Sequence, residues 1–178
     1  MALHTLAVLV DNSPGVLARV AGLFSRRAYN IDSLAVGPTE NPEISRMTIV
    51  VNVEGHALEQ VIRQLDKLVN VIHIAEMKPA NSTQAELLMV KVKNSSEAKS
   101  LADKFGAKVV DENGDSITIE ATGSTENISE LLGALKKIGI RELVQSGMVA
   151  LERGATALSE RTLEIQSVST DTQADYQN

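Results

Sequence analysis

The sequence predicts an α+β protein made of two successive β-α-β-β-α-β units. Three observations lead to this fold class: short apolar segments rich in β-formers, longer segments whose apolar residues recur at helical spacing, and clusters of turn-forming residues between them. The same order of elements occurs twice in 178 residues. A chain of this length holds one large domain or two small ones, so the repeat favours two small domains.

The first unit opens with a strand and a helix joined by a tight turn. Residues 3–10 are apolar and rich in β-formers, and residues 11–15 (DNSPG) are turn formers that end the strand. The apolar residues that follow have the spacing of an amphipathic helix: Val16, Leu17, Val20, Leu23 and Phe24.

The rest of the first unit predicts a hairpin, a second helix and a last strand. Residues 30–37 and 44–53 are expected to be strands, because the polar, proline-bearing stretch between them is typical of a hairpin loop. Residues 71–77 predict the last strand. The helical stripe before it consists of Leu58, Val61, Ile62, Leu65 and Leu68.

The second unit repeats this pattern after a linker at residues 79–83 (PANST). Its expected elements are a strand at 87–92, a helix at 98–105, a hairpin of strands 108–110 and 116–121 around Asn113 and Gly114, a helix at 128–138 and a strand at 143–151. The stripe of its second helix is Ile128, Leu131, Leu132, Leu135 and Ile138. Each of these residues lies 70 positions after its counterpart in the first unit, which supports the same fold type twice.

Two such units predict ferredoxin-like domains in tandem, each an antiparallel sheet with both helices on one face. The expected domain boundaries are 1–78 and 84–151, followed by a polar C-terminal tail at 152–178. The composition of the tail is typical of disorder. Its weak apolar alternation would let part of it dock on a neighbour. The other face of each sheet is expected to be uncovered. Bare sheet faces and edges favour pairing, so we expect at least a dimer.

Composition excludes several classes of function. Aromatic residues make up only 2% of the chain and the net charge is −6, so neither base stacking nor a basic field supports binding of nucleic acid or of an anionic membrane. The absence of cysteine excludes disulfides and Cys-ligated zinc. No signal-peptide pattern and no apolar run long enough for a membrane span occur, so we expect a cytoplasmic protein.

The basic residues Arg19, Arg26 and Arg27 are seven and eight positions apart, which places them on one face of a helix. One interpretation is an ordinary solvated surface. The other is a docking patch for an acidic partner, with Arg19 and Arg26 as the candidate contact residues.

No catalytic or metal-binding constellation is present in the sequence. The histidines are His4, His56 and His73, without the spacing of metal ligands and without a paired nucleophile. Neither GxGxxG nor GxxxxGK[ST] occurs, so the common nucleotide-binding loops are not supported. An enzyme interpretation therefore has no residues to carry it.

The turn at residues 11–15 is the strongest candidate site. A helix start offers backbone N–H groups and partial positive charge, which suit a small anion such as an amino acid carboxylate. Gly15 would let a ligand approach the backbone, and Asn12 can both donate and accept a hydrogen bond. The alternative interpretation is structural: Asn12 or Ser13 caps the helix and Pro14 occupies its first turn.

A family resemblance is carried by residues 11–51, DNSPGVLARVAGLFSRRAYNIDSLAVGPTENPEISRMTIVV. This segment resembles the ACT domain of the small regulatory subunits of acetolactate synthase (acetohydroxyacid synthase). The second unit, through SGMVALERG at 146–154, resembles the C-terminal domain of the same family, so that the resemblance covers about residues 1–157.

The resemblance implies a non-catalytic regulatory subunit of branched-chain amino acid biosynthesis. Such a subunit activates a separate catalytic large subunit and confers feedback inhibition by valine. The cofactors of that reaction, thiamine diphosphate, magnesium and flavin (FAD), belong to the large subunit, so none is expected to bind here.

The resemblance also implies a homodimer in which two ACT domains join edge to edge and bind L-valine at their interface. Assembly beyond the dimer stays open. The effector-binding residues implied are the turn and helix start of one chain and the start of the second strand of the other: Asn12, Gly15, Val16, Leu17, Asn30 and Ile31. Backbone N–H groups would take the carboxylate, and Asn30 would accept from the ammonium.

One departure from the family pattern occurs at Ala28, where many relatives have glycine. If this residue is the left-handed cap of the first helix, alanine costs roughly 1 kcal/mol there and alters how Asn30 is presented.

Two other functions compete with the regulatory-subunit interpretation. An ACT-domain sensor with a different partner shares every feature above, whereas an RNA-recognition domain lacks stacking aromatics on its strands.

Overall fold

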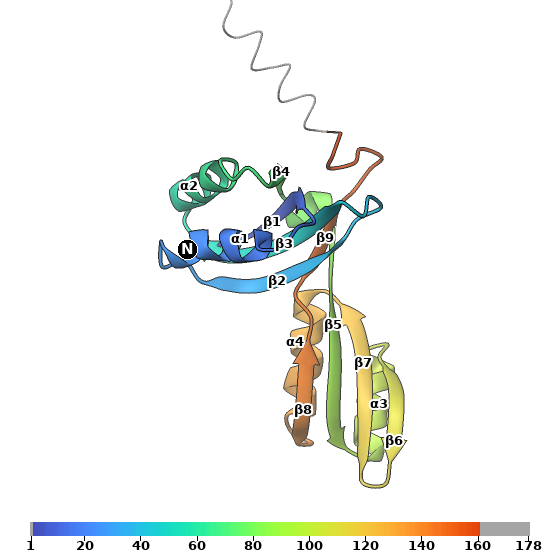
Figure 1. The fold of residues 1–178 in the computed structure, drawn as a ribbon. Helices are drawn as coiled ribbons and strands as arrows, with labels where there is room; N and C mark the ends of the chain where they lie inside the picture. Colours follow the sequence, from blue (N-terminus) through green and yellow to red (C-terminus); the bar gives the residue numbers. More distant parts are fainter. Residues whose placement is uncertain (1, 161–178) are drawn as a thin grey trace, which may run out of the picture. The chain divides into compact units, whose positions relative to one another are not determined.

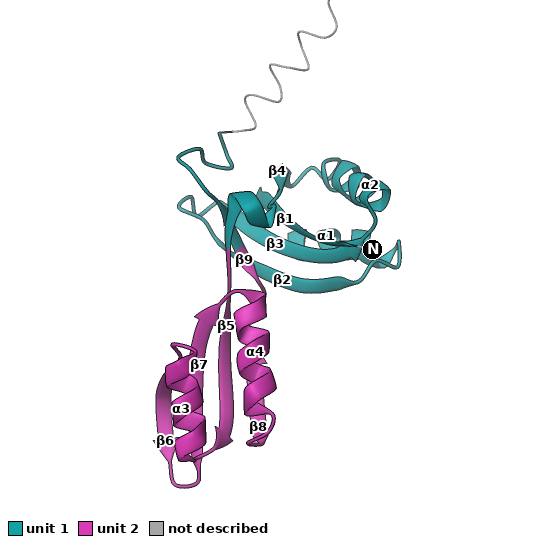
Figure 2. Cartoon of the chain, turned by 180° about the vertical axis from the view of Figure 1, so that it is seen from behind, with its two compact units in different colours: residues 1–83, 150–178 teal, residues 84–149 magenta. Residues whose placement is uncertain are grey.

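The computed structural model describes residues 2–160, and its internal contacts divide the chain into two compact units. The first unit contains the described part of residues 1–83 and 150–178, and the second contains residues 84–149 (Figure 2). The boundary expected from the sequence placed Ala150 and Leu151 in the second domain, whereas contacts group them with the first unit.

The first unit is an antiparallel sheet with two helices (Figure 1). Its elements are β1 (Ala2–Asp11), α1 (Val16–Ser25), β2 (Ile31–Pro38), β3 (Ile44–Val53), α2 (Gly55–Leu65) and β4 (Val71–Glu76). The strand order is β2-β3-β1-β4, so β2 forms one edge of the sheet. The predicted β-α-β-β-α-β order is confirmed.

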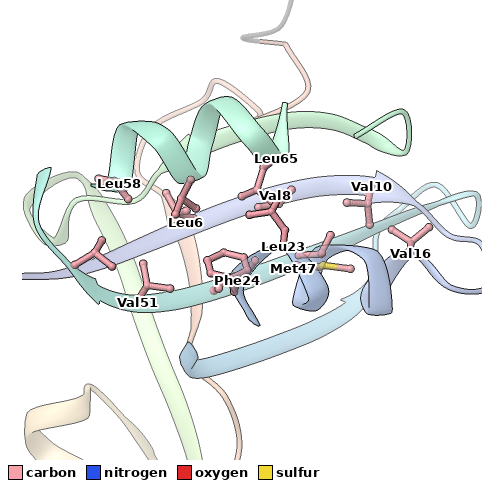
Figure 3. Close-up of a cluster of buried hydrophobic side chains, with 14 residues drawn as sticks. Leu6, Val8, Val10, Val16, Leu23, Phe24, Met47, Val51, Leu58 and Leu65 are labelled. Atoms are coloured by element: carbon pink, nitrogen blue, oxygen red, sulfur yellow. The ribbon is translucent and has the colours of Figure 1, made fainter. Parts of the chain in front are cut away.

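Both helices of this unit pack against the same face of the sheet. Alternate residues of β1 and β3 point toward the helices, as the period of a strand requires: Leu6, Val8, Val10, Met47, Ile49 and Val51. Between them lies Phe24 of α1, which is 1% exposed, with Leu58 and Leu65 of α2 above the sheet (Figure 3). The apolar stripes seen in the sequence are therefore the faces that the helices bury.

The second unit has the same architecture. Its elements are β5 (Ser82–Lys93, which begins at the end of the first unit), α3 (Ser96–Lys104), β6 (Lys108–Asn113), β7 (Ser116–Gly123), α4 (Thr125–Leu135) and β8 (Ile140–Gln145), in the strand order β6-β7-β5-β8. In α4 the buried residues Ile128, Leu131 and Leu135 occupy the positions that Leu58, Val61 and Leu65 occupy in α2. The tandem ferredoxin-like fold is confirmed. No helix of the described chain is long and apolar enough to cross a membrane.

Two segments differ from the sequence-based expectation. The expected linker forms a 3₁₀ turn, η1 (Pro79–Asn81), and then the start of β5. The single strand expected at 143–151 is wrong, because β8 ends at Gln145 and a separate strand, β9 (Val149–Glu152), pairs with β5. The break follows from Ser146, whose hydroxyl accepts a 2.9 Å hydrogen bond from the N–H of Leu87 and takes the place of a backbone carbonyl.

Part of the helix-free face of the first sheet is covered by residues 150–158, which we call the C-terminal strap. Arg46 donates a 2.7 Å hydrogen bond from Nη2 to the carbonyl oxygen of Ala150. Leu158, 8% exposed, lies in a hydrophobic cluster with Leu9 and Met77. The expectation that this face is bare is therefore wrong beneath the strap. The part of the predicted polar tail at 161–178 lies outside the described residues.

Helix α1 ends in a Schellman motif, with Ala28 in the left-handed conformation. The φ angle of Ala28 is 54°, and it is the only non-glycine residue with positive φ in the described chain. The N–H of Tyr29 bonds to the carbonyl of Phe24, and the N–H of Ala28 bonds to that of Ser25, both at 3.1 Å. Ala28 is therefore the left-handed cap that was considered for this departure from the family pattern.

We therefore expect Ala28→Gly to stabilise the first unit by about 1 kcal/mol, because glycine adopts positive φ without the Cβ penalty. Chemical unfolding measures the effect. Ala21→Gly, in the interior of the same helix, is the control and should destabilise by about 1 kcal/mol. Equal losses of stability in both variants would contradict the assigned role of Ala28.

Candidate functional site

The turn between β1 and α1 is held by the β2–β3 hairpin loop and not by a helix cap. Asn12 donates from Nδ2 to the carbonyl of Pro42 at 2.9 Å, and its N–H donates to the carbonyl of Glu43 at 2.7 Å. No side chain caps α1, so the interpretation of Asn12 or Ser13 as its N-cap is wrong. The role of Asn12 is to fix the turn against the hairpin loop.

Gly15 enters α1 with a φ of 84°, a conformation that favours glycine. The first N–H groups of a helix have no partner inside the helix. Here no side chain caps them, and the N–H of Val16 donates to the carbonyl of Ser13 at 3.4 Å. Val16 is buried in the core, whereas Leu17 is 44% exposed and presents an apolar side chain beside these groups. The helix start thus combines anion-binding N–H groups with an aliphatic neighbour.

Asn30 and Ile31 lie at the other end of α1, just after its Schellman motif. The exposed Asn30 donates from Nδ2 to a carboxylate oxygen of Asp32 at 2.6 Å. This bond leaves the amide oxygen of Asn30 able to accept a hydrogen bond. Ile31 begins β2 and packs at the margin of the core, partly exposed.

The two groups of predicted effector residues are far apart in one chain. Helix α1 has 10 residues, which corresponds to about 15 Å between the turn at Gly15 and the segment at Asn30. The two groups of predicted effector residues therefore lie at opposite ends of the same helix, and one chain does not bring them together.

A hydrogen-bond chain that the sequence analysis missed braces the turn from the opposite side. Arg19 donates from Nη1 to Oδ1 of Asn70 at 2.6 Å, and Asn70 donates from Nδ2 to Oδ2 of Asp11 at 2.9 Å. The N–H of Asp11 also donates to the carbonyl of Asn70. No local signal identifies Asn70, because it lies 51 and 59 positions from its partners.

The two candidate partner-contact residues have different surroundings. Arg19 belongs to the bracing chain just described. Arg26 follows the last residue of α1 and donates from Nε to the carbonyl of Gly22 at 3.2 Å, at the exposed end of the helix. The guanidinium charge of Arg26 thus also satisfies a carbonyl at the C-terminal end of the helix dipole.

Metal ligation finds no support among the described residues, where no group of three or more His, Cys, Asp or Glu side chains could hold an ion. The turn and Asn30 offer hydrogen-bonding groups and the dipole of the α1 start, a chemistry that suits a small polar molecule.

Two family models match the chain, one for each unit. Residues 6–73 match the AHAS small subunit-like ACT domain, and residues 85–154 match the small subunit of acetolactate synthase. The first match includes the turn at Gly15 and the start of β2, so it covers both groups of predicted effector residues.

Individual relatives give the same result over most of the chain. An acetolactate synthase small subunit from Mycolicibacterium smegmatis is 52% identical over 155 residues, covering 85% of this chain and 91% of the relative. A probable acetolactate synthase small subunit from Archaeoglobus fulgidus is 46% identical, covering 85% and 97%. The crystal structure of the small subunit from Thermotoga maritima superposes with a TM-score of 0.82 at 32% identity, covering 88% of this chain and all of that one.

Proposed function

Because the chain belongs to the family of acetolactate synthase small subunits, we propose that it is a non-catalytic regulatory subunit that activates a catalytic large subunit and confers feedback inhibition by L-valine. The observation that carries this proposal is the 52% identity to a named small subunit over 85% of the chain. Thiamine diphosphate, magnesium and flavin would be held by the large subunit, and the complex would work in the cytoplasm.

The edge strand β2 supports a homodimer formed through the ACT domains. Strand β2 pairs with β3 on one side only, so its other edge presents backbone N–H and C=O groups to a further strand. Val36 on this strand is 45% exposed, which adds apolar surface at the same edge. Pairing of β2 with β2 of a second copy would join two four-stranded sheets into one of eight strands.

The strand registers explain why this pairing would complete the effector site. Pro38 at the end of β2 pairs with Ser45, and Ser45 pairs with Val10, just before the turn. The end of β2 therefore lies at the Gly15 end of α1, and its start lies at the other end. A second copy in antiparallel, two-fold pairing would place its own Asn30 and Ile31 beside this Gly15.

The combined half-sites suit a branched-chain amino acid. The first N–H groups of α1 would take the α-carboxylate. The amide oxygen of Asn30 from the second copy, with the nearby carboxylate of Asp32, would take the ammonium. Leu17 and Ile31 would contact the aliphatic side chain, as expected for valine.

Regulation follows if valine binds one arrangement of the dimer better than another. An effector shifts a conformational equilibrium only by its differential affinity for the states, and such coupling is typically worth about 1–3 kcal/mol.

The exposed Arg26 is the better candidate for contact with the large subunit, since the Arg19 side chain is already hydrogen-bonded to Asn70.

Reconstitution with the cognate large subunit tests this function. Addition of the purified chain should raise acetolactate formation by the large subunit, and L-valine should lower it again. An ACT-domain sensor with a different partner would bind an amino acid and leave the large subunit unchanged. No rise in activity at stoichiometric concentrations would contradict the proposed regulatory role.

A further inference from the structure

A cavity of about 540 Å³ lies under the C-terminal strap, entirely within the first unit. Its apolar walls come from the helix-free face of the sheet and from the strap: Leu9, Ile44, Met77 and Leu158. The volume is in the range of small-molecule sites. None of the effector residues implied by the family resemblance lines this cavity.

Arg46 is the cation of this cavity, and its position follows from strand geometry. On β3 the next residue, Met47, points into the core, so Arg46 points to the helix-free face. Its neighbours across the strands are Gly37 and Leu9. Gly37 has no side chain, which leaves room beside the guanidinium.

The guanidinium of Arg46 has unused hydrogen-bonding capacity. Within residues 2–160 it makes one hydrogen bond, to the carbonyl of Ala150, although a guanidinium carries five N–H donors. Burial lowers the pKa of Arg46, and the charge of Glu40 partly opposes this shift. An arginine remains protonated under such conditions, so a partly buried positive charge faces the cavity.

Two carboxylates line the same cavity, Glu40 from the β2–β3 loop and Glu152 from β9. One cation and two anions disfavour a ligand with two negative charges. They suit a molecule that carries one carboxylate and one ammonium, with an apolar body for the aliphatic walls. Arginine binds a carboxylate with a fork of two parallel N–H donors.

We propose that this cavity is a second small-molecule site, which binds a free aliphatic amino acid through its carboxylate on Arg46 and its ammonium near Glu40 and Glu152. The site is separate from the effector site at the dimer interface and needs only one chain. It therefore goes beyond the proposed function and does not depend on it. A bound ligand would also contact the strap and hold it against the sheet.

Calorimetry on the full-length chain tests this site in an Asn30→Ala background, which weakens the interface site. L-Leucine is the probe, and we expect it to bind once per chain. Two analogues separate its charges: 4-methylpentanoate lacks the ammonium and 3-methylbutylamine lacks the carboxylate, and both should bind more weakly. Arg46→Gln should lower the affinity for L-leucine by about tenfold to a hundredfold, as expected for the loss of hydrogen bonds to a charged group.

Arg153→Gln is the matched control, because it removes the same charge from an exposed strap residue that does not line the cavity. It should leave the affinity for L-leucine unchanged. Ala155→Phe enlarges a side chain of the cavity lining without altering Arg46 and should also weaken binding, which covers the case that Arg46→Gln loosens the strap. No binding of L-leucine, or binding that neither Arg46→Gln nor Ala155→Phe changes, overturns the inference. The proposed function is decided separately, by the response of the large subunit to the chain and to valine.

Discussion

Val36→Lys is expected to convert the dimer into monomers and to weaken valine binding by at least about tenfold. Val36 lies on the edge strand β2 and is 45% exposed, so a lysine there costs the monomer little. In the dimer the two-fold axis would bring both lysines to the same strand pair, where like charges repel and an edge lysine blocks pairing. Sedimentation velocity gives the oligomeric state, and calorimetry gives the valine affinity.

The second unit offers a matched control for this variant. Val110 lies on β6, an edge strand of the second sheet, and is also 45% exposed. Val110→Lys should therefore change neither the dimer nor valine binding. If Val110→Lys dissociated the dimer and Val36→Lys did not, the proposed interface would be on the wrong domain.

Asn30→Ala is expected to separate activation from feedback inhibition. The variant should still activate the large subunit, but valine binding should weaken by at least about tenfold, because the hydrogen-bond acceptor for the ammonium is lost. Asn30 is exposed and its only side-chain bond in the described structure is to Asp32, so the effect on folding should be within about 0.5 kcal/mol. Asn127→Ala, at an exposed position of α4, is the control and should bind valine normally.

The outcome for Asn30→Ala can contradict the proposed site in one clear way. If the large subunit paired with this variant were inhibited by valine as strongly as with the unmodified chain, Asn30 would have no part in recognition. A loss of activation as well as of inhibition would mean that the residue supports the fold or the partner contact and not the effector.

The core of both domains could be predicted from the sequence because burial follows local periodicity. Leu58, Val61 and Leu65 recur at helical spacing, and the same three positions are buried in α4. The left-handed cap considered for Ala28 is present, since a departure from the family pattern marks that position locally, whereas the positive φ of Gly15 was not predicted.

The features that the sequence analysis missed depend on contacts between distant residues. The hydrogen bond from Arg46 to Ala150 joins residues 104 positions apart, so no local pattern predicts that the strap packs on the first sheet. Asn12 looked like a helix cap, but its side chain bonds to Pro42 in a loop 30 positions away. The break after β8 depends on a hydrogen bond between Ser146 and Leu87 of β5, which a single-strand pattern does not reveal.

In the proposed dimer, one valine is held by two copies of the chain, and a complementation titration tests this arrangement most directly. Gly15→Val forces a branched residue into a φ of 84° and should spoil the turn half-site, whereas Asn30→Ala spoils the other. Each variant alone should bind valine poorly. A mixed dimer contains one intact site, so an equimolar, exchanged mixture should recover about one quarter of the normal valine stoichiometry. If the mixture binds no more valine than the two variants do separately, the site is not shared between two chains and the account is wrong.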